Sequence, residues 1–281
     1  MRLFFHRIPS RQCWGVQKKS KRSTNNVFEI FAHRGLIDEY PENSLPALRE
    51  SFRRGFGVET DLRLTKDGDF LIIHDDTSLR LIGMRRRVED ATLKEAETMQ
   101  YAHSDEHLIS FRTFLTMAAK ENKGHQMAIH LKADAQDEAG LTLLAKYWRE
   151  FDLYKTAFTF DLTKKAAVCL KEIDPKIQIA LIISEFKFEP TIYTWEEVKD
   201  FKPMDIVWAA EYKKLYSKKF IDEVKATGRT FYAMSPDVHW ILNHPLGYEG
   251  YEKTWDDLIA WGADGICTDY PEKLAKCLTR G

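Results

Sequence analysis

The stretch GVETDLRLTKDGDFLIIHDD, residues 57–76, contains the pattern that decides the fold. Its first part, GVETDLRL (57–64), is a short apolar and β-branched run without the clean alternation of a strand that has one face in water. Runs of this kind are typical of parallel strands buried on both faces. FLIIH (70–74) follows after the short segment TKDGD. This connection is too short for a parallel crossover, so we expect an antiparallel hairpin there.

Similar runs occur along the whole chain and bring the number of expected barrel strands to eight. Between them lie segments with apolar residues at helical spacing, such as SLPALRESFRRGF (44–56) and AGLTLLAKYWREF (139–151). This repeated alternation predicts an α/β fold, a closed (β/α)₈ TIM barrel, with a six-stranded doubly wound sheet as the alternative. The other runs are FEIFAH (28–33), MAIHLK (127–132), AFTFDL (157–162), IQIALII (177–183), DIVWAA (205–210), TFYAMS (230–235) and DGICTD (264–269).

Residues 27–281 are expected to form one barrel domain, because no Gly-, Ser- or Pro-rich linker, low-complexity tract or internal repeat divides them. The FLIIH hairpin would be an excursion above the barrel mouth, directly after the second strand. Residues 75–110 are polar and rich in Arg and Glu, and we expect them to form a small inserted cap. A composition of 44% hydrophobic and 30% charged residues is typical of a globular protein with an ample core.

Residues 1–26 form a separate basic arm, with seven Lys or Arg side chains and no acid. The arm has three interpretations: a disordered tail, an organelle-targeting sequence, or a segment that makes weak contact with an anionic membrane. Pro9 and a broken apolar pattern interrupt any amphipathic helix in it. No apolar run in the chain is long enough for a signal-peptide core or a transmembrane segment.

Charge and cysteine content restrict the partners and the compartment. The net charge is −1, and without the basic arm the remainder is acidic. A duplex-binding surface needs a basic stripe, so we expect a small-molecule substrate and no nucleic acid. The four cysteines are scattered and form no CxxC pair, which favours a reduced, cytoplasmic setting. The sequence leaves the oligomeric state open.

Polar residues stand where the expected strands end, and the active site of a barrel lies at those ends. Glu59 and Asp61 are two residues apart on one strand, so both carboxylates point to the same face. Burying both inside a barrel is costly unless a cation compensates them. His33 ends the first strand and His74 ends the hairpin strand. Each feature alone has an ordinary structural explanation, but together they predict a reaction centre.

Five segments resemble the glycerophosphodiester phosphodiesterase family. The match is specific in the first third of the chain and near its C-terminus, and weak in the middle. The resemblance implies a metal-dependent phosphodiesterase on a TIM barrel that converts a glycerophosphodiester, or a related sugar or lipid headgroup diester, to an alcohol and a phosphomonoester. The matching segments are AHRG (32–35), PENS (41–44), VETD (58–61), TKDGDFLIIHDD (65–76) and GADGICTDYP (262–271).

The resemblance also implies residue roles. His33 and His74 match the family's two catalytic histidines, and Glu59 and Asp61 match two ligands of its divalent metal. One imidazole can remove a proton from the nucleophile while the other protonates the leaving alkoxide. Magnesium or calcium, held by hard carboxylate oxygens, can neutralise the charge of the phosphodiester. Water or a substrate hydroxyl could be the nucleophile, and the sequence does not distinguish them.

Two further matches concern the phosphate. Arg34 matches the phosphate-contacting arginine of the HRG turn, and its planar guanidinium can bind two phosphate oxygens. Lys132 matches the lysine of the family's third inward motif, which is usually Glu-x-Lys, and is expected to contact the substrate. In this chain the motif reads IHLK, so His130 replaces the third metal-binding glutamate.

The replacement by His130 leaves two possibilities open. In the first, the imidazole completes the metal site and shifts its preference towards manganese or zinc. Alternatively, His130 only forms hydrogen bonds inside the barrel, and magnesium is held by two carboxylates and water molecules.

The seventh strand is a second departure from the family pattern. It ends in AMSPDVH (233–239), so Ser235, Asp237 and His239 are candidates for contact with the substrate, although a turn after Pro236 is the ordinary interpretation. Two other functions remain possible. One is a phospholipase D-like lyase or transferase that forms a cyclic phosphate. The other is a catalytically silent barrel that binds phosphorylated headgroups.

Overall fold

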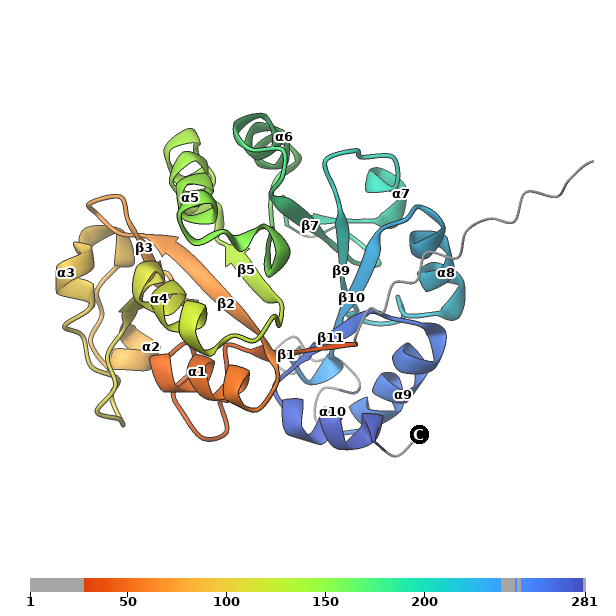
Figure 1. Ribbon diagram of the computed structural model, residues 1–281, viewed down its shortest axis with the longest axis horizontal. Coiled ribbons are helices and arrows are strands. Elements are labelled where there is room, and N and C mark those ends of the chain that lie inside the picture. The colour runs from red at the N-terminus through yellow and green to blue at the C-terminus, as the bar shows by residue number, and fades with distance from the viewer. Residues whose placement is uncertain (1–27, 188, 239–245, 247–248, 280–281) are drawn as a thin grey trace, which may run out of the picture.

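Eight parallel strands close into a barrel in the computed structural model, which describes residues 28–187, 189–238, 246 and 249–279. The ring is closed because β1 pairs with β2 on one side and with β11 on the other. Figure 1 shows the ring of strands with the helices on its outside. The strands are β1 (Glu29–His33), β2 (Gly57–Leu64), β5 (Met127–Leu131), β6 (Ala157–Phe160), β7 (Gln178–Ile183), β9 (Ile206–Ala210), β10 (Thr230–Met234) and β11 (Gly265–Thr268).

All eight barrel strands lie within the eight runs predicted from the sequence, so the predicted TIM barrel is confirmed and the open sheet is excluded. Each strand is followed by a helix before the next barrel strand. Several helices begin at a side chain that accepts a backbone N–H; Ser44, for example, accepts from Ala47. The helices are α1 (Leu45–Arg53), α4 (Phe111–Glu121), α5 (Glu138–Phe151), α6 (Lys164–Ile173), α7 (Trp195–Val198), α8 (Lys218–Ala226), α9 (Tyr251–Trp261) and α10 (Pro271–Leu278).

The interior of the barrel is filled with aromatic side chains. The ring of Phe31 on β1 lies 5.9 Å from that of Phe158, 5.3 Å from that of Trp208 and 4.9 Å from that of Tyr232, centroid to centroid, in edge-to-face contacts. Burial of each such ring contributes about 1.5–3 kcal/mol. The strands therefore enclose a packed core, and the active site of such a barrel lies at the carboxyl ends of its strands.

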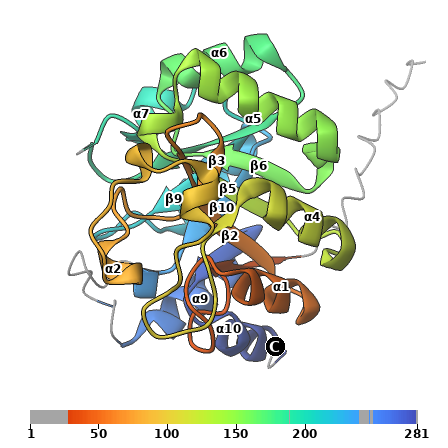
Figure 2. The same cartoon turned by 90° about the vertical axis from the view of Figure 1, so that its left-hand side faces the viewer.

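An antiparallel extension leaves the barrel after β2, as the short turn predicted. β3 (Phe70–Ile72) pairs with β2 in the register Leu62↔Ile72, and β4 (Ile109–Ser110) pairs with β3. Between them lie α2 (Leu79–Ile82), a 3₁₀ turn at Val88–Asp90 and α3 (Leu93–Ala96). We call the segment from β3 to β4 the cap; its orange part lies to the left of the barrel strands in Figure 2.

The cap has a small apolar core of its own. Leu71 and Ile73 pack there with Val88, Ala96 and Leu108. The cap is thus anchored by buried side chains rather than attached as a free loop.

Smaller elements complete the described chain. β8 (Ile192–Tyr193), which the sequence did not reveal, adds to β7, and 3₁₀ turns lie at Ala133–Ala135 and Leu153–Lys155. Among the described residues, no helix combines the length and apolar character needed to cross a membrane. The basic arm, residues 1–26, lies outside the described residues.

The cysteines do not decide the compartment. Cys169, Cys267 and Cys277 are free thiols. The cytoplasmic setting therefore stays a prediction.

Candidate active site

A cavity of about 690 Å³ opens at the carboxyl ends of the barrel strands. One part of its wall is charged and belongs to β1, β2, β5 and the cap. The other part is mainly apolar and belongs to β6, β7, β8, β9 and β10. The charged wall includes most of the residues predicted from the sequence: His33, Arg34, Glu59, His74, His130 and Lys132.

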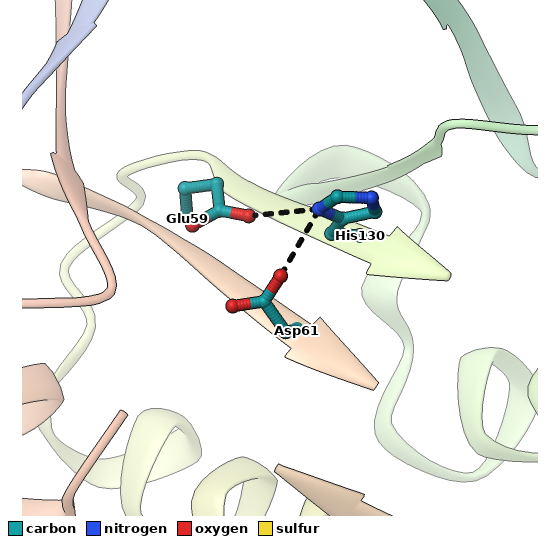
Figure 3. Close-up of side chains that lie close together, drawn as sticks. All are labelled: Glu59, Asp61 and His130. Carbon is teal, nitrogen blue, oxygen red and sulfur yellow. Dashed lines mark ion pairs between the residues drawn. The ribbon is translucent and has the colours of Figure 1, made fainter. Parts of the chain in front are cut away.

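Glu59, Asp61 and His130 converge at the floor of this cavity. Asp61 on β2 is the direct neighbour of His130 on β5 in the strand register. Nδ1 of His130 lies 3.0 Å from Oδ1 of Asp61 and 3.6 Å from Oε1 of Glu59, as Figure 3 shows. One ligand atom from each residue lies within 4.8 Å of the others, so the three could share one metal ion.

The surroundings of the two carboxylates fit a cation. Glu59 and Asp61 are almost fully buried. Oε2 of Glu59 has no hydrogen-bond partner, and Oδ1 of Asp61 faces the ammonium of Lys132 and the ring of His130. Burial raises the pKa of Asp61, but Lys132 and Arg34 outweigh it and hold that pKa well below its usual range, so the carboxylate is charged. A buried carboxylate oxygen without a donor, such as Oε2 of Glu59, is costly unless a cation binds it. Two carboxylates and an imidazole suit a divalent ion.

Lys132 lies against the same cluster. Its Nζ is 2.9 Å from Oδ1 of Asp61 and 3.1 Å from Nδ1 of His130. Burial and Lys132 lower the pKa of His130, but Asp161 and Asp61 outweigh them and raise it to about 10. A divalent ion would therefore compete with this proton and with the ammonium of Lys132 for the same atoms.

His33 is held by a carboxylate from the opposite end of the chain. Nδ1 of His33 lies 2.6 Å from Oδ1 of Asp269, which follows β11, and its Nε2 points towards Glu59 at 3.9 Å. Asp269 is fixed in turn, because its backbone N–H donates to Asp237 at 2.8 Å. Burial and Arg34 lower the pKa of His33, but Asp269 and Glu59 outweigh them and raise it above its usual value. Sequence reasoning did not single out Asp269, although it stands at a strand end.

His74 reaches the cavity from the cap, two residues beyond β3. Its Nδ1 lies 2.8 Å from Oδ1 of Asp75, and Nε of Arg80 donates to the other oxygen of Asp75 at 2.7 Å. Burial lowers the pKa of His74, and Lys132 and Arg34 add to this effect. The hydrogen bond to Asp75 and the negative charge of Asp61 oppose them without reversing the direction.

Arg34 is positioned by a tight turn. It adopts a left-handed backbone conformation with φ 56°, and Gly35 follows with φ 89°. A Cβ atom at Gly35 would meet Ala47 at 2.7 Å, so only glycine fits this turn. The guanidinium donates to Glu42 at 3.0 Å, and its Nε lies 3.5 Å from Oδ2 of Asp61. The group therefore faces the carboxylate cluster from the side of β1.

Ser235, which we expected to contact the substrate, lies away from the cavity wall. Ser235 is fully buried and is not part of the cavity wall; its hydroxyl donates to Asp237 and accepts from Nε1 of Trp255. Residues 236–238 form a 3₁₀ turn, the ordinary interpretation of Pro236, and Asp237 supports Asp269 from behind the site. His239 lies outside the described residues.

Comparisons with known proteins point to one family. A family model described as the glycerophosphoryl diester phosphodiesterase family matches residues 33–273. The glycerophosphodiester phosphodiesterase of Bacillus altitudinis is 24% identical over 258 residues, which are 88% of this chain and 97% of that protein.

Two solved structures share the fold. A phosphodiesterase from Oleispira antarctica, in complex with the product sn-glycerol-3-phosphate, gives a TM-score of 0.70 at 18% identity and covers 89% of this chain and 96% of that chain. A glycerophosphodiester phosphodiesterase from Agrobacterium tumefaciens gives 0.67 at 16% identity and covers 89% and 100%.

Proposed function

Because the chain belongs to the glycerophosphoryl diester phosphodiesterase family and is thus a phosphoric diester hydrolase, we propose that it hydrolyses a glycerophosphodiester, or a related sugar or lipid headgroup diester, with two histidines as acid and base. One observation carries the proposal. His33 and His74 line the same cavity as the carboxylate cluster, and each is bound through Nδ1 to its own carboxylate. Such a bond leaves Nε2 of each ring to exchange a proton with the substrate.

The environments of the two histidines suggest which is the base. His74 has a lowered pKa, so its ring is neutral near neutral pH and can take the proton of an attacking water molecule. This leaves His33 as the acid, and its raised pKa agrees with that role. The oxygen of water forms a bond to phosphorus, the ester P–O bond breaks, and the leaving alkoxide receives the proton of His33. The products are an alcohol and a phosphomonoester.

Binding of the phosphate is assigned to the cations of the charged wall. Arg34 presents a planar guanidinium held by Glu42, and Lys132 adds an ammonium group at the cavity floor. Glu59, Asp61 and His130 are the residues that would hold a divalent ion. When bound, such an ion neutralises the anionic phosphate oxygens and orients the group for attack.

The glycerophosphodiester class is supported by the family and by one neighbour in fold. The phosphodiesterase from Oleispira antarctica binds sn-glycerol-3-phosphate as its product, and we infer that this chain releases a phosphomonoester of the same kind. The paired histidines also argue against a silent headgroup-binding barrel, since binding alone requires no acid and base.

The test is a panel of glycerophosphodiesters, each incubated with Mg²⁺, Mn²⁺, Ca²⁺ or Zn²⁺ in ¹⁸O-labelled water. We expect metal-stimulated release of an alcohol and a phosphomonoester carrying one ¹⁸O atom. If the product were a stable cyclic phosphate without label, the reaction would be that of a lyase and not a hydrolysis. Tight phosphate binding without turnover on any diester would instead favour a silent barrel.

A further inference from the structure

His130 contacts acids on both edges of its ring. Nδ1 faces Asp61 at 3.0 Å and Glu59 at 3.6 Å, whereas Nε2 lies 2.8 Å from Oδ2 of Asp161, the residue after β6. The ring also packs against Phe160, with 4.6 Å between the centroids. The imidazole is therefore fixed between the carboxylate cluster and one further carboxylate.

The local backbone is shaped to place Asp161 there. Asp161 adopts a left-handed conformation with φ 66°, which is uncommon for a residue other than glycine. Gln136 stabilises this bend, because its Nε2 donates to the carbonyl oxygens of Asp161 at 2.7 Å and of Leu131 at 2.9 Å. The side chain of Thr191 forms a hydrogen bond to the Asp161 carboxylate. A strained residue held by several partners is typical of a functional position.

The bond to Asp161 decides which nitrogen of His130 is available. An ionised carboxylate can only accept, so Nε2 of His130 carries a proton and donates it to Asp161. The lone pair of a neutral ring is then on Nδ1, the nitrogen that faces Glu59 and Asp61. Metal-binding histidines commonly donate their other N–H to a carboxylate in this way, which fixes the tautomer and strengthens the ligand.

We propose that Asp161 is a positioning residue that makes Nδ1 of His130 a metal ligand, so that the site prefers Mn²⁺, Co²⁺ or Zn²⁺ to Ca²⁺. This inference rests on the metal dependence in the proposed function. An imidazole nitrogen suits borderline transition metals, whereas Ca²⁺ takes oxygen ligands almost throughout. Asp161 is not part of the Glu59, Asp61 and His130 cluster and acts only through the imidazole.

The test is direct metal binding by the full chain after removal of metals with a chelator. Calorimetry measures the affinities for Co²⁺, Mn²⁺ and Ca²⁺, and the visible spectrum of Co²⁺ reports its ligands. Asp161→Asn is the informative change, because asparagine tolerates the left-handed backbone and keeps the shape of the side chain. Its matched control is Asp134→Asn. Asp134 also lines the cavity, but it pairs with Arg63 at 2.9 Å.

We expect Asp161→Asn to weaken Co²⁺ and Mn²⁺ binding by about 10–100-fold and to alter the Co²⁺ spectrum. The affinity for Ca²⁺ and the affinities of the Asp134→Asn control should stay close to the wild-type values. A folded Asp161→Asn protein with the wild-type Co²⁺ affinity and spectrum would overturn the inference.

A second variant covers the case in which Asp161→Asn fails to fold. His130→Ala should lose Co²⁺ affinity to a similar extent, and adding Asp161→Asn to it should cause no further loss, because Asp161 acts through the ring. Wild-type Co²⁺ binding by His130→Ala would refute the inference on its own. Hydrolysis of phosphodiesters is measured separately. Metal binding as expected without turnover would therefore contradict the proposed function and leave the role of Asp161 intact.

Discussion

Two regions of the cavity carry the same chemical unit, a histidine bound through Nδ1 to an aspartate, but they build it differently. His33 ends β1 and Asp269 directly follows β11, and only 12% of each side chain is exposed. His74 and Asp75 are neighbours in the cap, with 36% and 24% exposed, and Asp75 is shared with Arg80. The pKa is raised for His33 and lowered for His74.

The difference shows that the partner carboxylate alone does not set the charge of a histidine. At His33, burial and Arg34 lower the pKa, but Asp269 and the nearby Glu59 outweigh them. At His74, burial is the largest effect, and together with Lys132 and Arg34 it outweighs the hydrogen bond to Asp75 and the charge of Asp61, so the pKa falls. Pairs of groups whose pKa values are separated in this way are typical of acid–base sites.

Removal of either imidazole should have the largest effect on the rate. We expect His33→Ala and His74→Ala each to lower kcat by about 10²–10⁴-fold, because each ring transfers one of the two protons. Steady-state kinetics on a cleaved diester measures this, with circular dichroism as the check on folding. His103→Ala, an exposed histidine of the cap, is the control. A near-normal rate in either test variant would remove that ring from the acid–base pair.

The second-largest effect should come from removal of one metal ligand, which shifts the dependence of the rate on metal. Asp61→Asn takes away a buried negative charge that faces both His130 and Lys132, so the metal concentration for half-maximal rate should rise by about 10–100-fold. A metal titration of the rate checks this, with Asp67→Asn, on the exposed turn before β3, as the control. If the metal titration of Asp61→Asn matched that of the wild type, the metal would bind somewhere other than this cluster.

The two aspartates should separate the barrel pair from the cap pair. Asp269→Asn should lower kcat by about 10²-fold, since a buried, fixed partner sets the tautomer of His33. Asp75→Asn should cost about 10-fold or less, because His74 is more exposed and keeps its place through the cap. Comparison of kcat and KM for both variants tests this order. Equal losses of kcat in the two variants would mean that the two aspartates contribute equally to catalysis.

The smallest effect should be a shift of the pH profile. His74 must be neutral to act as a base, so the rate falls as the pH drops through its pKa, which burial lowers from the ordinary value of a histidine. The hydrogen bond to Asp75 raises that pKa, so Asp75→Asn should move the acid limb to still lower pH. The pH dependence of kcat shows the shift, and movement of the limb to higher pH would contradict the assignment.

The parts of the fold that depend on local pattern could be predicted from the sequence. Each barrel strand is an apolar run, and the short TKDGD connection between β2 and β3 allows only a hairpin. The carboxylate pair of Glu59 and Asp61 could be recognised because alternate residues of one strand share a face.

Contacts created by closure of the barrel could not be predicted in this way. Asp269 is 236 positions from His33 in the sequence, and only the pairing of the last strand with the first brings them together. Asp161 is 31 positions from His130, and its direction depends on a left-handed backbone that no residue type announces. Asp75, by contrast, could be recognised from the sequence, because it directly follows His74 in the HDD segment. The burial of Ser235 could not be read from the sequence either, because it depends on the fold around the turn at 236–238 and on Trp255, 20 positions away.

The most direct test of the account joins metal binding and catalysis in one titration. Metal-depleted protein is titrated with Mn²⁺ while release of glycerol 3-phosphate from a glycerophosphodiester is followed, for the wild type and for His33→Ala and His74→Ala. We predict a wild-type rate that rises from near zero and saturates, and two variants that bind Mn²⁺ normally but remain about 10²–10⁴-fold slower. A rate independent of metal, or normal rates in either variant, would contradict it.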